Sequence, residues 1–327
     1  MSAKQLKVIA MGLAVLLLLW GASELFSRGS DTVTTKFTLP ALTQGDVDTI
    51  MLVKGADSVV LAKQSSTAWT ANGHRAAPDA VGDLFQALHD SVKPELVAED
   101  SSSFGRMGVD SASGRWVRIS NAGKPLLRLI VGARGSEYAS AYIRRPGDSR
   151  VYLWRGRLTG LLDRGADEWR DKRIAVVNLD SVRAIEVERG KDRYTLRRHD
   201  KTWALEGGAT TATDSGAVGR LVERYRAITA ASFASPKEAD STRALRPVRR
   251  VALRGAGGTL LVALSFDSTS GAYVVRRTGG TATGGEPGAA YRMNTWDVDG
   301  LTPAQSTLIA AKQQEKKTKQ QEKAKKK

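Results

Sequence analysis

The residues best suited to acid–base or metal chemistry are few in this chain. Its three histidines, His74, His89 and His199, stand far apart, and there is no cysteine. A zinc site built from histidine and cysteine is therefore excluded, and there is no HExxH pair to indicate a histidine-rich one. We expect His74 in a turn, His89 near a helix end and His199 beside Asp200 in a hairpin, none of them catalytic.

Motifs for nucleophilic catalysis and phosphate binding are also absent from the sequence. It contains no GxSxG nucleophile elbow and no Gly-Lys-Ser/Thr phosphate loop. Its glycine-rich segments do not open a helix after a strand, so we interpret them as turns and loops. Two carboxylate pairs have the spacing of polar loops, where charged side chains are usually exposed to solvent. These pairs are Asp163 with Asp167 and Asp297 with Asp299. We predict no catalytic residue, no metal ligand and no cofactor, and a protein that is not an enzyme.

Aromatic and basic side chains are the remaining candidates for ligand binding. Six tryptophans could stack on sugars or bases: Trp69, Trp116, Trp154, Trp169, Trp203 and Trp296. Trp69 and Trp203 occupy equivalent places in two similar stretches of sequence, which favours packing between a sheet and a helix. Adjacent arginines recur in strand-like segments, at 144–145, 197–198, 249–250 and 276–277. Strand alternation sends one arginine of each pair to each face, and a basic stripe on one face is the alternative.

An apolar run near the N-terminus indicates where the protein is located. Residues 8–26 follow Lys4 and Lys7 and are almost uninterruptedly apolar. As a helix the run would be about 28 Å long, close to the roughly 30 Å hydrocarbon core of a bilayer. The positive-inside bias places the N-terminus in the cytoplasm and the rest of the chain outside. The alternative is a cleaved signal peptide, with Gly21-Ala22-Ser23 near the cleavage point.

Positive charge is concentrated at the C-terminus. The chain has a formal net charge of +16, and its last 16 residues hold eight lysines and two glutamates. Such a tail has no apolar face to bury, so we expect it to be solvated. The alternative is contact with anionic lipid, an envelope polymer or an acidic partner surface. Nucleic acid is a poor candidate ligand outside the membrane.

The central part of the sequence contains the same pattern twice. Each copy opens with strand-like segments, the first of which begin at residues 47–50 and 179–182. A helix follows in each copy, at residues 79–92 and 215–228, with apolar side chains at i, i+3, i+4 and i+7. One face of each helix should therefore pack on a sheet. Asp79 and Ser215 stand where we expect the helix N-caps.

Each helix leads into a hairpin and two more strands. The hairpins are expected at residues 117–132 and 251–266, with glycine in the turns. The later strands are expected near residues 141–145 and 151–154 in the first copy, and near 272–277 and 290–293 in the second. Each copy therefore follows the order β-β-α-β-β-β-β.

The predicted fold class is α+β, with an N-terminal transmembrane helix followed by two tandem similar domains. Each domain is an antiparallel sheet with a helix packed on one face. The expected division is a cytoplasmic N-terminus (1–7), a transmembrane anchor (8–26), a linker (27–36), a first repeat (37–173), a second repeat (174–309) and a Lys-rich tail (310–327).

Several short motifs occur in an order that is informative: Trp69, the segment 79–88, Phe104-Gly105, the segment 169–173 and Trp203. Together they resemble a bacterial family of uncharacterised proteins, the domain of unknown function 4340 family, and the similarity extends from about residue 37 to 308. The resemblance implies a single-pass protein of the inner membrane with its bulk in the periplasm. Family members are often encoded beside a gliding-motility-type ABC transporter permease and its auxiliary subunit, which implies these two partners.

The function expected from these observations is that of a non-enzymatic, membrane-anchored extracytoplasmic accessory or scaffold protein of an ABC-type transport complex. One alternative is a periplasmic binding module for an anionic polymer or lipid. Another is an unrecognised hydrolase, which would need a deep pocket with convergent ionisable groups. The last alternative is that the protein is a spacer that only holds a distance between membrane and envelope.

Overall fold

The computed structural model describes residues 37, 39–89, 94–137, 139–156, 158–206 and 213–310. The expected N-terminus (1–7), anchor (8–26), linker (27–36) and nearly all of the tail (310–327) lie outside these residues. No helix in the described ranges is long and apolar enough to cross a bilayer.

The first half of the described chain forms a nine-stranded antiparallel sheet. Its strand order is β4-β3-β2-β1-β6-β7-β8-β9-β5. The strands are β1 (Thr49–Lys54), β2 (Asp57–Lys63), β3 (Trp69–Ala71), β4 (His74–Arg75), β5 (Glu95–Ala98), β6 (Arg115–Asn121), β7 (Lys124–Arg134), β8 (Ser140–Arg144) and β9 (Val151–Arg155). The expected hairpin turn joins β6 to β7, where Ala122 and Gly123 have φ angles of 49° and 75°.

Helix α2 (Pro78–His89) covers one face of this sheet through the apolar stripe expected from the sequence. Leu84 is fully buried, and the Phe85 ring lies 5.8 Å from the Trp69 ring. Trp69 therefore packs between sheet and helix, as predicted. The predicted N-cap is wrong, because the helix already begins at Pro78 and Asp79 lies in its first turn. A carboxylate there still interacts favourably with the helix dipole.

The opposite face of the first sheet is covered at one end, while Arg118, Leu126 and Arg128 on β6 and β7 are exposed. Short segments around α3 (Phe104–Met107) form a small separate core in which Met107 and Val109 pack against Ile130 and Val151. Strand alternation places Ile130 on this face and its neighbour Leu129 in the main core. The expectation of cover on one face only is therefore incomplete.

The second half forms an eight-stranded antiparallel sheet with a corresponding order, β13-β12-β11-β16-β17-β18-β19-β15. Its strands are β11 (Ala184–Arg189), β12 (Asp192–His199), β13 (Thr202–Glu206), β15 (Ser232–Phe233), β16 (Arg249–Arg254), β17 (Leu260–Thr269), β18 (Ala272–Gly279) and β19 (Ala290–Asn294). Within the described residues the two orders correspond strand by strand, apart from the edge strand β4. Each sheet has its own hydrophobic core.

Three helices accompany the second sheet, α6 (Ser215–Arg224), α7 (Pro236–Arg243) and α8 (Thr295–Leu301). Ser215 is not the N-cap of α6, contrary to our prediction. The cap is Asp214, whose side chain accepts a hydrogen bond from the backbone N–H of Ala217 at 2.9 Å. Helices α7 and α8 were not foreseen, because both are short and mostly polar. The α+β class is confirmed.

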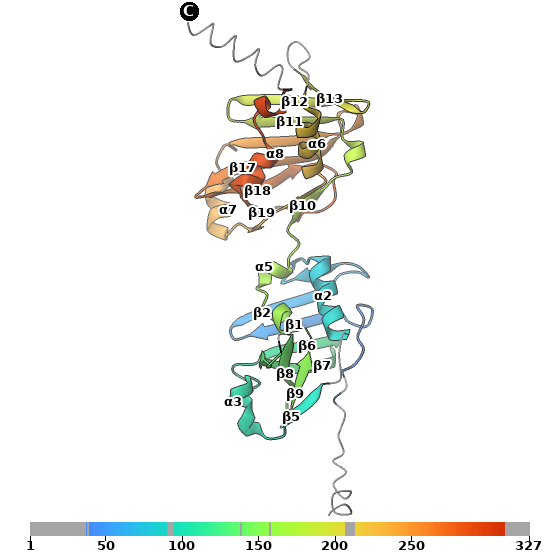
Figure 1. Ribbon diagram of the computed structural model, residues 1–327, viewed down its shortest axis with the longest axis vertical. Helices are drawn as coiled ribbons and strands as arrows, with labels where there is room; N and C mark the ends of the chain where they lie inside the picture. The colour runs from blue at the N-terminus through green and yellow to red at the C-terminus, as the bar shows by residue number, and fades with distance from the viewer. Residues whose placement is uncertain are drawn as a thin grey trace, which may run out of the picture.

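Short elements join the halves, which lie one above the other along the long axis of the molecule (Figure 1). Helices α4 (Leu158–Leu162) and α5 (Ala166–Trp169) complete the first half. Strand β10 (Arg173–Val176) then pairs with β14 (Ala227–Thr229) in a small two-stranded sheet beside the second.

Candidate functional site

The segment from Trp169 to Arg173 ties the two halves together through its backbone, and we call it the joint. On one side, the carbonyl of Trp169 accepts a hydrogen bond from Ala77 at 2.8 Å, and the N–H of Asp171 donates to the carbonyl of Arg75 at 2.8 Å. On the other side, the carbonyl of Lys172 accepts from Ala230 at 2.9 Å and that of Arg173 from Gly285 at 2.8 Å. Consecutive residues of one segment therefore belong to opposite halves.

Side chains reinforce the joint around a buried carboxylate. Asp171 is 4% exposed and binds Arg75 at 3.2 Å and Arg173 at 2.8 Å. Hydrogen bonding to Asp171 raises the pKa of Arg173 above its ordinary value. A carboxylate buried to this degree requires such partners, because an unpaired buried charge is costly.

Contacts between the halves converge on Arg170 and Glu286. The guanidinium of Arg170 bonds Asp167 at 3.1 Å and Glu286 at 3.4 Å, and it lies 3.5 Å from the centroid of the Phe233 ring. The other oxygen of Glu286 lies 2.8 Å from Nδ1 of His74, at the edge of the first sheet. Glu286 thus links two residues of the first half to the second.

Beside these contacts lies an open groove of about 690 Å³, which we call the joint groove. The first half contributes His74, Asp167 and Arg170 to its lining. The second half contributes charged side chains from α7, β18 and β19: Glu238, Arg243, Arg276 and Arg292. Four arginines and two carboxylates therefore line the groove, and Glu286, Asp267 and Asp240 pair with three of these arginines from just outside the lining.

The arginines of the second half are held in place to different degrees. Arg276 bonds Asp267 at 3.0 Å and also donates to Thr242 of α7, whereas Arg292 bonds Glu238 at 2.9 Å. Arg243 is 77% exposed and its Asp240 contact is long, at 3.7 Å. Arg243 is therefore the side chain of this set best placed to meet another molecule.

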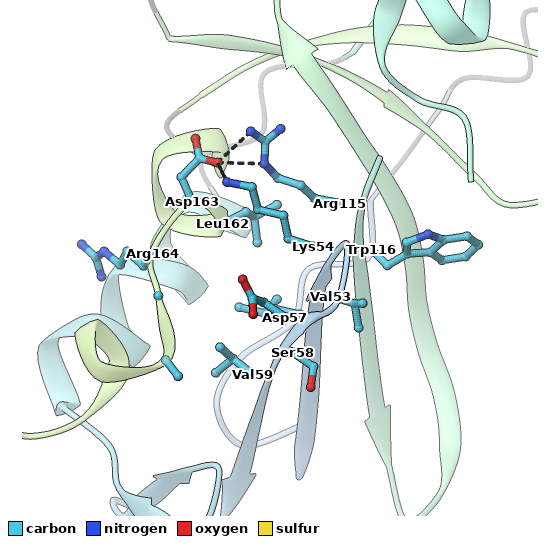
Figure 2. Close-up of a pocket in the computed structure, with 13 residues that line it drawn as sticks. Val53, Lys54, Asp57, Ser58, Val59, Arg115, Trp116, Leu162, Asp163 and Arg164 are labelled. Atoms are coloured by element: carbon cyan, nitrogen blue, oxygen red, sulfur yellow. Dashed lines mark hydrogen bonds and ion pairs between the residues drawn. The ribbon is translucent and has the colours of Figure 1, made fainter. Parts of the chain in front are cut away.

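A smaller pocket of about 330 Å³ lies within the first half, between the β1–β2 hairpin and the end of α4. Figure 2 shows Lys54 and Arg115 converging on Asp163, while Trp116 points away. Asp163 bonds Lys54 Nζ at 2.9 Å and Arg115 at 2.7 Å. Burial alone would raise the pKa of Asp163, but the hydrogen bonds from Lys54 and Arg115 outweigh it and the pKa is lowered. A carboxylate held this way is suited to fixing α4, not to accepting a proton.

Comparison with protein families identifies the relatives of the chain. Residues 69–247, more than half of it, match the family described as domain of unknown function (DUF4340). The chain belongs to the DUF4340 family. The matched region runs from β3 to the end of α7 and includes the whole joint. No curated protein and no solved structure matches this DUF4340 protein.

The structure disperses the titratable residues that the sequence singled out. In the DUF4340 chain His74 lies in strand β4 and not in a turn as we expected, whereas His89 ends α2 and His199 ends β12 before a hairpin turn, as expected. No group of three or more histidine, aspartate or glutamate residues in the described ranges could hold a metal ion. Of the carboxylate pairs, Asp163 and Asp167 are exposed, as expected. The other pair lies partly buried in α8, where Asp299 bonds Arg249 at 2.6 Å.

In two of the four arginine pairs one neighbour is buried and the other exposed, as strand alternation predicts. Arg144 is buried and donates to the carbonyl of Val109 at 3.0 Å, while Arg145 is exposed. Arg249 is buried against Asp299 and Thr302, while Arg250 is exposed. The inward members therefore tie loops and helices to the sheets of the DUF4340 protein.

The tryptophans differ widely in exposure. Trp69, Trp154 and Trp169 are buried in the core of the first half. Trp116 and Trp203 are partly buried. Trp296 is 70% exposed, and its type and position in the sequence carried no signal that set it apart from the others.

Proposed function

We propose that this DUF4340 protein is a non-enzymatic, membrane-anchored extracytoplasmic accessory of an ABC-type transport complex. The anchor is the apolar run at residues 8–26, and the tandem similar domains at 37–173 and 174–309 form the extracytoplasmic part. The matching strand orders of the two sheets support this division. The gene neighbourhood implied for the family supports a permease and its auxiliary subunit as partners.

The observation that carries the proposal is the joint groove. Both halves line it, and the backbone and side-chain ties at the joint hold the halves together, so it can present one combined surface to a partner. Arg243, which is 77% exposed and has only a long contact with Asp240, favours an acidic partner surface, because complementary charges speed encounter and disfavour basic partners. We assign this role to an acidic extracytoplasmic surface of the permease.

The test is a pull-down of the full-length protein from its own membranes in detergent, followed by mass spectrometry. A second form, beginning at Ser27 and exported by a cleavable signal, shows whether the anchor is needed. We expect the permease and the ATPase to accompany the full-length protein, and to be lost with the form that lacks the anchor. Recovery of no transporter subunit with either form overturns the proposal.

Charge reversal tests whether the joint groove is the contact surface. Arg243→Glu reverses the most exposed arginine of the groove and breaks only a long ion pair. We expect it to lower permease recovery about fivefold, the effect of about 1 kcal/mol at a charged interface rim. The matched control is Arg193→Glu in β12, where the arginine is 60% exposed and its Glu188 contact is 3.9 Å. Equal recovery with the two variants would show that the groove is not the contact surface.

A further inference from the structure

Trp296, in α8, is the most exposed large apolar side chain in the described ranges. Its exposed fraction is 70%, against 55% for Leu245 and 46% for Val248. A large aromatic side chain in water contributes little to the stability of the fold, and its exposed ring can serve as a stacking surface for a ligand.

One face of the Trp296 indole is in contact with an arginine side chain. The guanidinium of Arg224, the last residue of α6, lies 4.8 Å from the ring centroid. Gly300 follows Trp296 by one helical turn, and a Cβ atom there would come within 2.8 Å of that guanidinium. The glycine therefore leaves room for Arg224 to lie along α8 and stack on the indole. One face of the ring is covered, and the high exposure of the residue leaves the other face open to solvent.

A groove of about 480 Å³ lies beside α8, a size typical of small-molecule sites. Trp296 is not part of its lining, but Arg224, which stacks on the indole, and Asp297, the next residue in α8, are. It is formed by the end of α6, by β14, by the end of β19 and by α8, and Ile228, Met293 and Leu301 contribute apolar surface. The amide of Asn294 donates to Asp297 at 3.3 Å, a long bond that leaves both groups hydrogen-bonding capacity. We call this groove, together with Trp296, the α8 groove.

The charged side chains that line the α8 groove are balanced. Two arginines, Arg224 and Arg226, stand beside two carboxylates, Glu223 and Asp297. Arg226 bonds Glu223 at 2.5 Å, and Arg224 is engaged on the indole. A strongly anionic ligand therefore gains no net attraction here.

We propose that the α8 groove binds a neutral glycan made of β-1,4-linked pyranose units. Equatorial substituents leave flat faces of axial C–H groups on such sugars, and these carry partial positive charge that suits the negative face of an indole. In this proposal one sugar ring lies on the open face of the indole, and further units of the glycan reach the groove, where Asn294, Asp297 and Arg226 supply donors and acceptors. This glycan site is independent of the proposed transporter contact, which lies at the joint groove.

The test is isothermal titration calorimetry of the full-length protein in detergent with cellotetraose and with chitotetraose. We expect at least one of these neutral tetrasaccharides to bind with a Kd on the order of 1 mM, in keeping with one stacking ring and a few hydrogen bonds. Trp296→Ala should weaken that binding at least about tenfold. Because the side chain is exposed, we expect the substitution to change the stability of the fold little. The matched control is Trp116→Ala in the first half, because Trp116 also carries a stacked arginine, Arg118, at 5.0 Å. Circular dichroism confirms that each variant is folded, and the control should bind as the parent does.

Three results would overturn the glycan proposal. The first is that neither neutral sugar binds at a sugar concentration of about ten times the expected Kd. The second is that Trp296→Ala leaves binding unchanged. The third is that tetragalacturonic acid binds while the neutral sugars do not. None of them bears on recovery of the permease, so the two proposals can fail separately.

Discussion

The central carbon of the Arg170 guanidinium lies 3.5 Å from the centroid of the Phe233 ring, although the two residues belong to different halves. The same guanidinium is 15% exposed and bonds carboxylates in both halves, Asp167 and Glu286. Cation–π contact and ion pairing therefore act together at one side chain, and the joint is a packed contact and not a free linker.

We expect Arg170→Ala to uncouple the halves. Removing the side chain should cost about 1–3 kcal/mol, since it deletes a stacked and paired guanidinium and leaves Glu286 with less charge compensation. Differential scanning calorimetry should show the unfolding of the two halves moving apart into separate transitions. The control is Arg164→Ala, because Arg164 bonds Asp83 at 3.1 Å and lies over Trp169 at 5.6 Å, both within the first half. Matching thermograms for the two variants would contradict a coupling role for Arg170.

Asp163 should make the stability of the first half depend on pH. Its pKa in the folded protein is lowered, so its contribution is fully present above its ordinary value of 3.8 and is lost as pH falls through the lower folded value. Because the side chain is 34% exposed, solvent screening limits the expected loss on Asp163→Asn to about 1 kcal/mol at pH 7. Urea titrations should show this difference shrinking as the pH falls below 3.8. Asp57→Asn, in the same pocket, serves as control, and an equal effect there would argue against the Lys54–Asp163–Arg115 contact as the cause.

Gly132 and Gly82 should respond in opposite directions to alanine. A Cβ atom at Gly132 would lie 2.2 Å from the carbonyl oxygen of Met107, whereas at Gly82 nothing lies within 4 Å. Gly132→Ala must therefore move the backbone of β7 away from the α3 segment, and we expect a loss of more than about 2 kcal/mol. Gly82 lies inside α2, where alanine should add about 0.5–1 kcal/mol. Thermal melts monitored by circular dichroism check both, and a neutral Gly132→Ala would show that α3 packs less closely than described.

Asp214, and not Ser215, should stabilise the start of α6. Only Asp214 accepts the backbone N–H of Ala217, so Asp214→Ala should cost about 1 kcal/mol and Ser215→Ala a few tenths at most. Urea denaturation of both variants measures the difference. The reverse order of effects would restore Ser215 as the cap.

Local patterns in the sequence were enough to predict the helices and strands that form the two hydrophobic cores. The stripe of Val81, Leu84, Phe85 and Leu88 predicts the buried face of α2, because helical periodicity alone decides which side chains share a face. The glycine at position 123 likewise predicts the β6–β7 turn, which needs a positive φ. Polar or very short elements gave no such signal. Helix α7 and strand β15 depend on caps and on a partner strand and not on an apolar repeat.

The sequence by itself determined the α+β class, the helix faces, the hairpins and membership of the DUF4340 family, since each rests on residues close together in the chain. The tertiary structure decided the functional surfaces. Glu286 meets His74 and Arg170 across 212 and 116 positions of sequence, and no local periodicity encodes such a meeting. The six tryptophans of the described chain are chemically identical, yet Trp154 is buried and Trp296 faces solvent. Burial depends on which other elements pack over a side chain, and that is settled only when distant parts of the chain come together.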